Sequence, residues 1–319
     1  MHDAVAGREI VVPGSISNLG SGFDALSLAV QLYLRVRILD VLPDAPDTLQ
    51  CQVVGRPITG ENRISTAFAR ARAVSGVPAP GLRVEVRSDI PLRAGLGGSG
   101  AATVAGLRLY EAVTEPRAAE DWLRLGCEIE GHPDNAAAAL LGGLTVSCQH
   151  ADGPVTARSC AWPSEIRLVV ATPHLEVATE DARRVLPESI PLRDAVFNLQ
   201  HALLLVHAVR SGRPEDLREA LRDRWHQAVR APFVPGLTEA LALEHPALLG
   251  ACLSGSGPSV VAFTKESAVI VELLRNLYET LGVPCSVRVL AAQPPAGTAE
   301  RRPNPADRQP RRPDLSGLA

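Results

Sequence analysis

Lysine, aromatic residues and long apolar runs are all scarce in this chain of 319 residues. Lys265 is the only lysine, and aromatic residues make up 3% of the sequence, so we expect a core of aliphatic and alanine side chains. No apolar run approaches the roughly 18 residues that a membrane-spanning helix needs. Residues 1–12 lack a basic start followed by an apolar stretch. We therefore expect no signal peptide, no membrane partner and a cytoplasmic location.

Several common site signatures are also missing. No segment fits GxxxxGK[ST], which excludes a Walker-type loop, and Lys265 is the only candidate for a lysine on bound phosphates. The six cysteines show neither CxxC nor Cys/His spacing, which favours reduced, buried thiols over disulfides or a zinc site. The formal net charge is −3, so no global basic field attracts nucleic acid, and we expect no nucleic-acid partner.

The most informative segment that is present is the glycine-rich stretch PLRAGLGGSGAA at residues 91–102. An alternating, strand-like segment at 82–90 precedes it, and an apolar, helix-like segment at 103–110 follows. Glycines let backbone N–H groups approach an anion, and the start of a helix favours negative charge. The stretch therefore predicts a phosphate-binding loop, although a glycine-rich turn without a ligand has the same composition.

Two further glycine segments have the same ambiguity. PGSISNLGSGFD at residues 13–24 contains Asn18 and Asp24, which can bind a polar substrate, and an ionised Asp24 suits an ammonium group. The same residues are common in plain turns. LSGSGPS at residues 253–259 lies between two predicted strands, where a tight turn fits as well as a binding loop.

The segment EGHPDN at residues 130–135 carries the polar side chains best suited to chemistry. Asp134 can cap the helix that follows it. In a functional interpretation, Glu130 ligates Mg²⁺ together with Ser99, since Mg²⁺ prefers oxygen ligands and keeps several waters. The side chains that then face the substrate are His132, Asp134 and Asn135.

The chain divides into two predicted domains and a tail. A segment rich in proline, glycine and serine at 152–163 suggests a boundary, so we expect domains at residues 1–160 and 161–292, followed by a disordered Pro/Arg-rich tail at 293–319. Predicted strands lie at 8–14, 31–41, 49–54, 82–90, 144–148, 166–172, 251–253, 260–264 and 285–290. Predicted helices lie at 62–74, 103–110, 117–130, 135–141, 194–211, 215–229 and 268–281.

The three glycine segments, in this order and separation, resemble the GHMP kinase superfamily. PGSISNLGSGFDALSLAV, EGHPDNAAAALLGG and LSGSGPS are most similar to homoserine kinases, as are TEDARRVLP, AVFNLQHA and DRWHQAVRAPFVPG further along. The resemblance covers about residues 10–290. It implies an α+β fold of two domains, a ribosomal-protein-S5-like N-terminal domain and a ferredoxin-like C-terminal α/β sandwich, with ATP and substrate between them. It also implies a homodimer and a role in threonine biosynthesis.

Site residues follow from the resemblance position by position. The implied ATP-binding residues are Asn62, Pro91, Leu92, Arg93, Ala94, Gly95, Leu96, Gly97, Gly98, Ser99, Gly100 and Ala101. The implied Mg²⁺ ligands are Ser99 and Glu130. The implied L-homoserine pocket is Asn18, Asp24, His132, Asn135, Thr179, Arg183 and Arg230. Two arginines suit the carboxylate of an amino acid, and Asp24 suits its ammonium group.

The implied reaction moves the γ-phosphoryl group of Mg-ATP to the substrate hydroxyl. Related mevalonate kinases have an aspartate where Asn135 stands, so the proton passes either to the phosphate itself or to a neighbour, Asp24 or Asp134. Gly98, Gly100 and Ser21 depart from the usual GLGSSAA and GPGFD patterns and affect fine specificity more than reaction type. A GHMP kinase for another small hydroxylated metabolite and a non-catalytic sensor remain alternatives.

Overall fold

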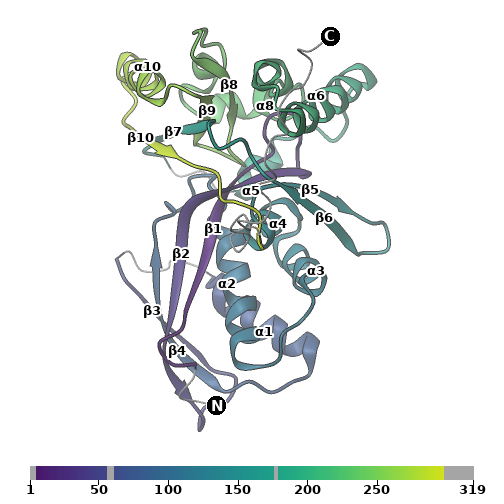
Figure 1. Cartoon of the computed structure of the whole chain (residues 1–319), viewed down its shortest axis with the longest axis vertical. Coiled ribbons are helices and arrows are strands. Elements are labelled where there is room, and N and C mark those ends of the chain that lie inside the picture. The colour runs from purple at the N-terminus through teal and green to yellow at the C-terminus, as the bar shows by residue number, and fades with distance from the viewer. Residues whose placement is uncertain (1–4, 56–60, 176–178, 298–319) are drawn as a thin grey trace, which may run out of the picture.

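The computed structural model describes residues 5–55, 61–175 and 179–297, and the side chains of residues 179–181 lie outside the description. Figure 1 shows an elongated molecule in which an N-terminal half with one sheet lies against a C-terminal half with a second sheet. Helices and sheets occur in both halves, so the predicted α+β class is confirmed. Within the described ranges, no helix combines the length and the apolar character that crossing a membrane requires.

The N-terminal half is a sheet with helices packed on one face (Figure 1). Its strand order is β3-β4-β2-β5-β6, and β1 pairs antiparallel with β2. The 17-residue strand β2 alternates buried and exposed side chains along much of its length and reaches from the far end of this half to the C-terminal half. The elements are β1 (Glu9–Ser17), β2 (Leu26–Leu42), β3 (Leu49–Val53), α1 (Arg63–Ser75), β4 (Gly81–Ser88), α2 (Gly98–Val113), α3 (Ala119–Glu130), α4 (Asp134–Leu141), β5 (Leu144–Gln149) and β6 (Val155–Cys160).

The C-terminal half is an antiparallel sheet in the order β10-β7-β9-β8. Along the chain, its long helices α6 and α10 each follow a strand, which gives the β-α-β-β-α-β pattern of the predicted sandwich. The elements are β7 (Arg167–Pro173), α5 (Thr179–Arg184), α6 (Leu192–Ser211), α7 (Leu217–Ala220), α8 (Gln227–Arg230), α9 (Leu237–Leu241), β8 (Leu248–Leu253), β9 (Val260–Thr264), α10 (Ser267–Thr280) and β10 (Cys285–Leu290), with 3₁₀ turns at Pro214–Asp216 and Ala231–Phe233.

Three expectations about local structure were wrong. The segment 152–163 contains strand β6, which pairs with β5. The predicted helix at 215–229 is broken, because the Asp223 carboxylate accepts hydrogen bonds from the backbone N–H groups of Trp225, His226 and Gln227. The start of the predicted tail at residue 293 was also wrong, because the backbone N–H of Gln293 donates to the carbonyl oxygen of Ala29. Residues 298–319 of the tail lie outside the described residues.

Helices α1 and α2 approach each other most closely at Gly106. A Cβ atom there would lie 2.3 Å from the carbonyl oxygen of Ile64 and 2.8 Å from the Cβ of Ala67. Asn62 caps the first turn of α1, its Oδ1 accepting from the N–H groups of Ile64 and Ser65 at 3.1 and 3.4 Å. The missing side chain at Gly106 therefore sets the distance between α2 and the start of α1.

We predict that Gly106→Ala lowers the free energy of unfolding by about 1–3 kcal/mol, because the added methyl group overpacks the α1–α2 contact. Gly98→Ala on the same helix is the matched control, since its Cβ would meet only Ile90 at 3.6 Å. Urea unfolding followed by circular dichroism measures both variants. Equal stability of the two variants would contradict the prediction.

Candidate active site at four converging loops

Four loops that are distant in sequence meet where the two halves of the molecule join. We call them the first loop (residues 18–25), the phosphate loop (89–97), the α3–α4 turn (131–133) and the third loop (254–259). The Oγ of Ser254 donates to the carbonyl oxygen of Gly95 at 2.6 Å, and the Nδ2 of Asn18 donates to that of Gly255 at 3.0 Å. The three predicted glycine segments are therefore in direct contact.

Two glycines of the phosphate loop permit this contact. Gly95 has φ +72° and Gly97 has φ +73°, a region that L side chains rarely adopt. A Cβ on Gly95 would lie 2.3 Å from the carbonyl oxygen of Ser254, and one on Gly97 would lie 2.1 Å from the Oγ of Ser15. Any side chain at either position would push the loop away from its neighbours.

The phosphate loop ends at the start of α2, five residues before the predicted helix start at Thr103. Gly97 is the N-cap, and no side chain caps the helix. The N–H groups of the first turn and the helix dipole are thus directed to an anion at this loop. Residues 95–100 also fit the spacing GxGxxG, but the next strand after α2, β5, pairs antiparallel with β2, whereas a dinucleotide-binding βαβ unit needs a following parallel strand.

The two glycines that depart from the family pattern have different surroundings. Gly98 is open, with only Ile90 within 4 Å of an added Cβ, so a serine hydroxyl fits there. A Cβ on Gly100 would lie 2.8 Å from the Cβ of Asn135. Gly100 therefore lets α4 and Asn135 approach α2 closely.

The predicted Mg²⁺ ligands lie next to each other. The Oγ of Ser99 donates to Oε1 of Glu130 at 3.0 Å, and the buried hydroxyl of Thr103 donates to the same oxygen at 2.5 Å. Ser99 lies in the first turn of α2, beside the anion site. A carboxylate and two hydroxyls are hard oxygen donors, so this group suits Mg²⁺ that is also bound to phosphate oxygens.

The α3–α4 turn places three polar side chains at the start of α4. Nδ1 of His132 and Oδ1 of Asp134 are 2.5 Å apart, and both residues are buried. Burial disfavours the charged imidazole, but the hydrogen bond and the charge of Asp134 outweigh it and raise the pKa of His132. Asn135 accepts a hydrogen bond from Ser15 at 2.7 Å. Asp134 makes no capping hydrogen bond, so the capping prediction was wrong.

The first loop has a strained backbone. Asn18, Leu19 and Asp24 have φ values of 73°, 45° and 54°. Asn and Asp tolerate this region better than other residues, and Oδ1 of Asn18 accepts the N–H of Asp24 at 3.0 Å. Such strain is common where a fold holds functional groups in place. The loop thereby presents the carboxylate of Asp24 to the C-terminal half.

Asp24 is paired with the first predicted arginine. Nη1 and Nη2 of Arg183 donate to the two carboxylate oxygens of Asp24 at 3.0 and 2.7 Å. Both side chains remain about one-third exposed, at 36% and 31%. The Arg183 guanidinium also lies 5.5 Å from the centre of the Phe23 ring. The pair can therefore open toward a ligand without unpacking the core.

The second predicted arginine is buried. Arg230 is 3% exposed and donates from Nε to the carbonyl of Ala182 and from Nη1 to Gly255 and to Nδ1 of His226, each at 3.1 Å. Burial and the charge of Arg183 lower the pKa of Arg230 to about 10, so it stays charged at neutral pH. Within the described part of the chain, Nη2 has no hydrogen-bond acceptor. It is the donor left for an anionic ligand.

Asp24, His132 and Asp134 also place potential metal-binding atoms within 4.8 Å of one another. Most of these potential metal-ligand atoms already make hydrogen bonds within the protein. Arg183 donates to both oxygens of Asp24, and His132 pairs with Asp134. The Ser99–Glu130 group is the better candidate for Mg²⁺. Of the remaining predicted site residues, Asn62 caps α1, and the side chain of Thr179 lies outside the described residues.

Sequence reasoning missed three supporting residues. Thr103 shares Glu130 with Ser99, and its i,i+4 spacing from Ser99 on α2 was a usable signal. His226, four residues before Arg230, donates from Nε2 to the carbonyl of Gly20 at 2.8 Å and so joins α8 to the first loop. Burial lowers the pKa of His226, which keeps its ring neutral and able to accept from Arg230. Ser254 gave no signal beyond its glycine neighbours.

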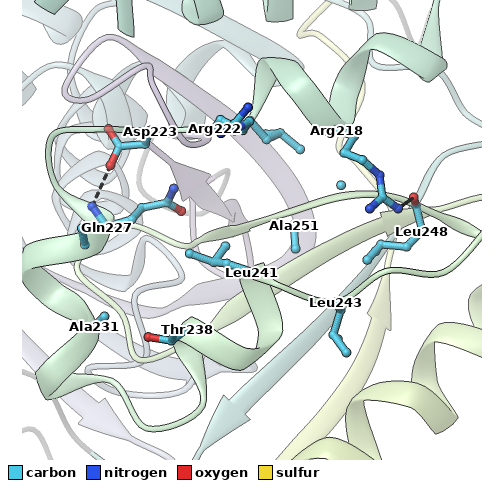
Figure 2. A pocket seen from close by; sticks show the side chains of 13 residues that line it. Arg218, Arg222, Asp223, Gln227, Ala231, Thr238, Leu241, Leu243, Leu248 and Ala251 are labelled. Atoms are coloured by element: carbon cyan, nitrogen blue, oxygen red, sulfur yellow. Dashed lines mark hydrogen bonds between the residues drawn. The ribbon is translucent and has the colours of Figure 1, made fainter. Parts of the chain in front are cut away.

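The cavity of Figure 2 lies elsewhere, in the C-terminal half between α7, α8, α9 and β8. Its volume is about 400 Å³, and no predicted site residue lines it. None of its lining residues belongs to the four converging loops. Gln227 connects the two regions, since it lines the cavity and accepts the N–H of Leu253 at 2.8 Å, just before the third loop.

Two family models and many relatives match this chain. The model "GHMP kinases N terminal domain" matches residues 62–143, and "GHMP kinases C terminal" matches residues 205–282. A homoserine kinase of Thermus thermophilus is 40% identical over 271 residues, covering 83% of this chain and 90% of the relative. A homoserine kinase of Nostoc sp. is 35% identical, covering 90% and 97%.

Solved structures give the same fold. The crystal structure of homoserine kinase from Cytophaga hutchinsonii matches with a TM-score of 0.77 over 89% of this chain and 94% of that chain, at 24% identity. That identity supports the fold alone. The predicted arrangement of two α+β parts with a ferredoxin-like C-terminal half is confirmed.

We predict that Asp134→Asn moves the titration midpoint of His132 from above 6.5 to below it, because burial then acts without the opposing carboxylate. The imidazole resonance, followed by NMR over pH, measures both proteins. In the wild type, the stability that this pair contributes is present at low pH and is lost as pH rises through the raised pKa. An unchanged midpoint would show that Asp134 does not set the protonation of His132.

Proposed function

We propose that this chain, which belongs to the homoserine kinase family of the GHMP kinases, transfers the γ-phosphoryl group of ATP to the side-chain hydroxyl of L-homoserine. The observation that carries the proposal is that three features meet at the four converging loops. They are the glycine loop before α2, whose first turn has no side-chain cap, the oxygen ligands of Ser99 and Glu130, and the buried Arg230. An anion site without a catalytic nucleophile suits phosphoryl transfer, where positioning and charge stabilisation do most of the work.

The nucleotide phosphates bind, in this proposal, at the start of α2. Backbone N–H groups of residues 98–100 hold phosphate oxygens, with glycines on either side of Ser99 keeping the surface open. Ser99 and Glu130 are the residues that would hold Mg²⁺, with Thr103 orienting the carboxylate. When bound, the ion neutralises charge that develops on the phosphate oxygens.

The substrate binds on the other side of the phosphate loop. Nη2 of Arg230 receives its carboxylate in a buried setting, where a charge-assisted hydrogen bond is strong. Asp24 receives its ammonium group. Because Arg183 now occupies both oxygens of Asp24, we infer that the ammonium competes for Asp24 and that Arg183 turns to share the carboxylate. A zwitterion replaces one ion pair by two, whereas a neutral sugar leaves Arg183 on Asp24 and gives Arg230 no anion.

Asn135 orients the hydroxyl in this proposal. Its Oδ1 accepts from Ser15, and its position over Gly100 brings it next to the phosphate loop. An amide cannot accept the proton, Asp24 pairs with the substrate ammonium group in this arrangement, and Asp134 is held by His132. We therefore assign the proton to an oxygen of the phosphoryl group as the new O–P bond forms and the bond to ADP breaks.

Several wider properties belong to the same proposal. Residues 1–160 supply the ATP site and residues 161–292 supply Arg183 and Arg230. We propose that the protein acts in the cytoplasm as a homodimer, and that its product, O-phospho-L-homoserine, serves threonine biosynthesis. Arg183 and Arg230 suit a substrate that carries a carboxylate, and this favours an amino-acid substrate over a neutral sugar.

The decisive assay is ADP release with Mg-ATP and five acceptors: L-homoserine, L-serine, L-threonine, mevalonate and galactose. We predict a kcat/KM for L-homoserine at least about 100-fold above that for any other acceptor. Mevalonate and galactose leave charged groups of the pocket unpaired, and the hydroxyl of L-serine or L-threonine lies one carbon closer to the amino-acid groups, which holds it short of the phosphate. If only another acceptor is turned over, the protein is a kinase but L-homoserine is not its substrate. If ATP binds and no acceptor is turned over, both the kinase activity and the substrate assignment are wrong.

We predict that Glu130→Gln lowers kcat by about 100-fold and raises the Mg²⁺ concentration for half-maximal rate, because a neutral amide is a weaker ligand. Glu128→Gln, two residues earlier on α3 and paired with Arg124, is the matched control and keeps wild-type kinetics. A Mg²⁺ titration of initial rates compares the two. Equal Mg²⁺ dependence of Glu130→Gln and wild type would remove Glu130 from the metal site.

A further inference from the structure

Phe23 contacts both arginines of the candidate site. The guanidinium carbon of Arg183 lies 5.5 Å from the centre of its ring, and that of Arg230 lies at 5.4 Å. A cation within about 6 Å of the centre of an aromatic ring is attracted by the negative face of the ring. Phe23 directly precedes Asp24 in the first loop. One uncharged side chain therefore lies beside both cations that the proposed function assigns to the acceptor carboxylate.

The ring of Phe23 is held by the segment that leads into α8. The ring of Trp225 lies 4.9 Å from it at an interplanar angle of 47°, and that of His226 lies at 5.3 Å and 42°. His226 is buried and donates to the carbonyl oxygen of Gly20 in the first loop. The Asp223 carboxylate accepts from the backbone N–H groups of Trp225 and His226. These contacts set the position of Phe23 before any ligand binds.

The two arginines share one carboxylate. Arg183 donates to both oxygens of Asp24, whereas Arg230 donates to two carbonyl oxygens and to His226. Burial and, after it, the charge of Arg183 lower the pKa of Arg230, so the two cations repel each other. When the ammonium group of a substrate takes Asp24, Arg183 loses its carboxylate partner. Among the described residues, the Phe23 ring is then the attractive partner that remains for its guanidinium.

We propose that Phe23 is a positioning residue that keeps Arg183 beside Arg230 while the substrate ammonium takes Asp24, so that both guanidiniums meet the acceptor carboxylate. This role rests on the proposed function, because L-homoserine supplies both the ammonium group and the carboxylate. A phenyl ring suits the task, since it attracts a cation but has no strong hydrogen-bond acceptor that competes with the ligand. Without the ring, the 36% exposed side chain of Arg183 would extend into water, and ordering it on the ligand would cost conformational entropy.

A second phenylalanine, Phe197 on α6, has the same kind of surroundings away from the site. The guanidinium carbons of Arg224 and Arg222 lie 4.0 and 5.7 Å from the centre of its ring. The ring also stacks on His201 at 3.6 Å. Phe23 and Phe197 are both half-buried, and neither Arg222 nor Arg224 belongs to the four converging loops. Phe197 is therefore a matched control for the loss of a ring that contacts two arginines.

Steady-state kinetics with two acceptors test the role of Phe23. The acceptors are L-homoserine and aminopropanol, which has the ammonium group and the hydroxyl of L-homoserine but no carboxylate. Phe23→Leu keeps an apolar side chain and removes the ring. We expect it to raise KM for L-homoserine about 3–30-fold, the range that a cation–π contact gives, with little change in kcat or in KM for aminopropanol. Phe23→Tyr, which keeps a ring, should restore KM for L-homoserine, and Phe197→Leu should leave it unchanged.

A binding measurement without turnover separates this role from the proposed function. L-2-Aminobutyrate is L-homoserine without its hydroxyl, so it fits the same pocket and cannot accept a phosphoryl group. NMR of the arginine δ-methylene protons reports the ring-current shift that the Phe23 ring causes, and Arg183→Lys assigns the resonances of Arg183. We expect Arg183 to keep this shift when L-2-aminobutyrate binds and to lack it in Phe23→Leu.

Three results would overturn the role of Phe23: loss of the Arg183 shift on binding, an equal rise of KM for both acceptors in Phe23→Leu, or failure of Phe23→Tyr to restore KM. Each of them leaves turnover of L-homoserine by the wild type intact. If the wild type does not bind L-2-aminobutyrate, the substrate assignment of the proposed function is wrong, and the role of Phe23 falls with it.

Discussion

The buried guanidinium of Arg230 is the interaction on which the site depends. It bonds to the carbonyls of Ala182 and Gly255 and to His226, and it lies 5.4 Å from the Phe23 ring of the first loop. A buried charge is tolerated only where such partners satisfy it. Three segments of the C-terminal half and the first loop must therefore meet around one side chain. That meeting leaves Nη2 without a hydrogen-bond acceptor among the described residues, and the proposal assigns it to the substrate carboxylate.

Close backbone approach explains why glycine is so frequent around this charge. Because Gly95 and Gly97 have no side chains, the phosphate loop lies directly against Ser254 and Ser15. A Cβ on Gly20 would lie 2.0 Å from the carbonyl oxygen of Leu221. These contacts join the anion site at the start of α2 to the pocket of Arg230. Backbone atoms therefore fix the separation of these loops. Beside them, the side chains of Asp24 and Arg183 are each about one-third exposed.

The sequence predicted most of the fold because its signals are local. Alternation predicted β4 and most of β2, and the glycine loop predicted that a helix follows it. The break at Asp223 was missed, because the carboxylate that ends the helix bonds to backbone groups that periodicity does not register. The expected neighbours Ser99 and Glu130 share a hydrogen bond, and their role as Mg²⁺ ligands stays a prediction. The role of His226 depends on three-dimensional proximity to Gly20, which spacing alone does not give.

The central claim is that a buried arginine reads the carboxylate of the acceptor, and a two-substrate comparison of Arg230→Met tests it most directly. The acceptors are L-homoserine and aminopropanol, which is homoserine without its carboxylate. If Arg230 binds the carboxylate, the loss of kcat/KM in the variant is about 100-fold or more greater for L-homoserine than for aminopropanol, since a charge-assisted hydrogen bond is lost only with the first. An equal loss for both acceptors would mean that Arg230 only supports the loops, and it would contradict the account.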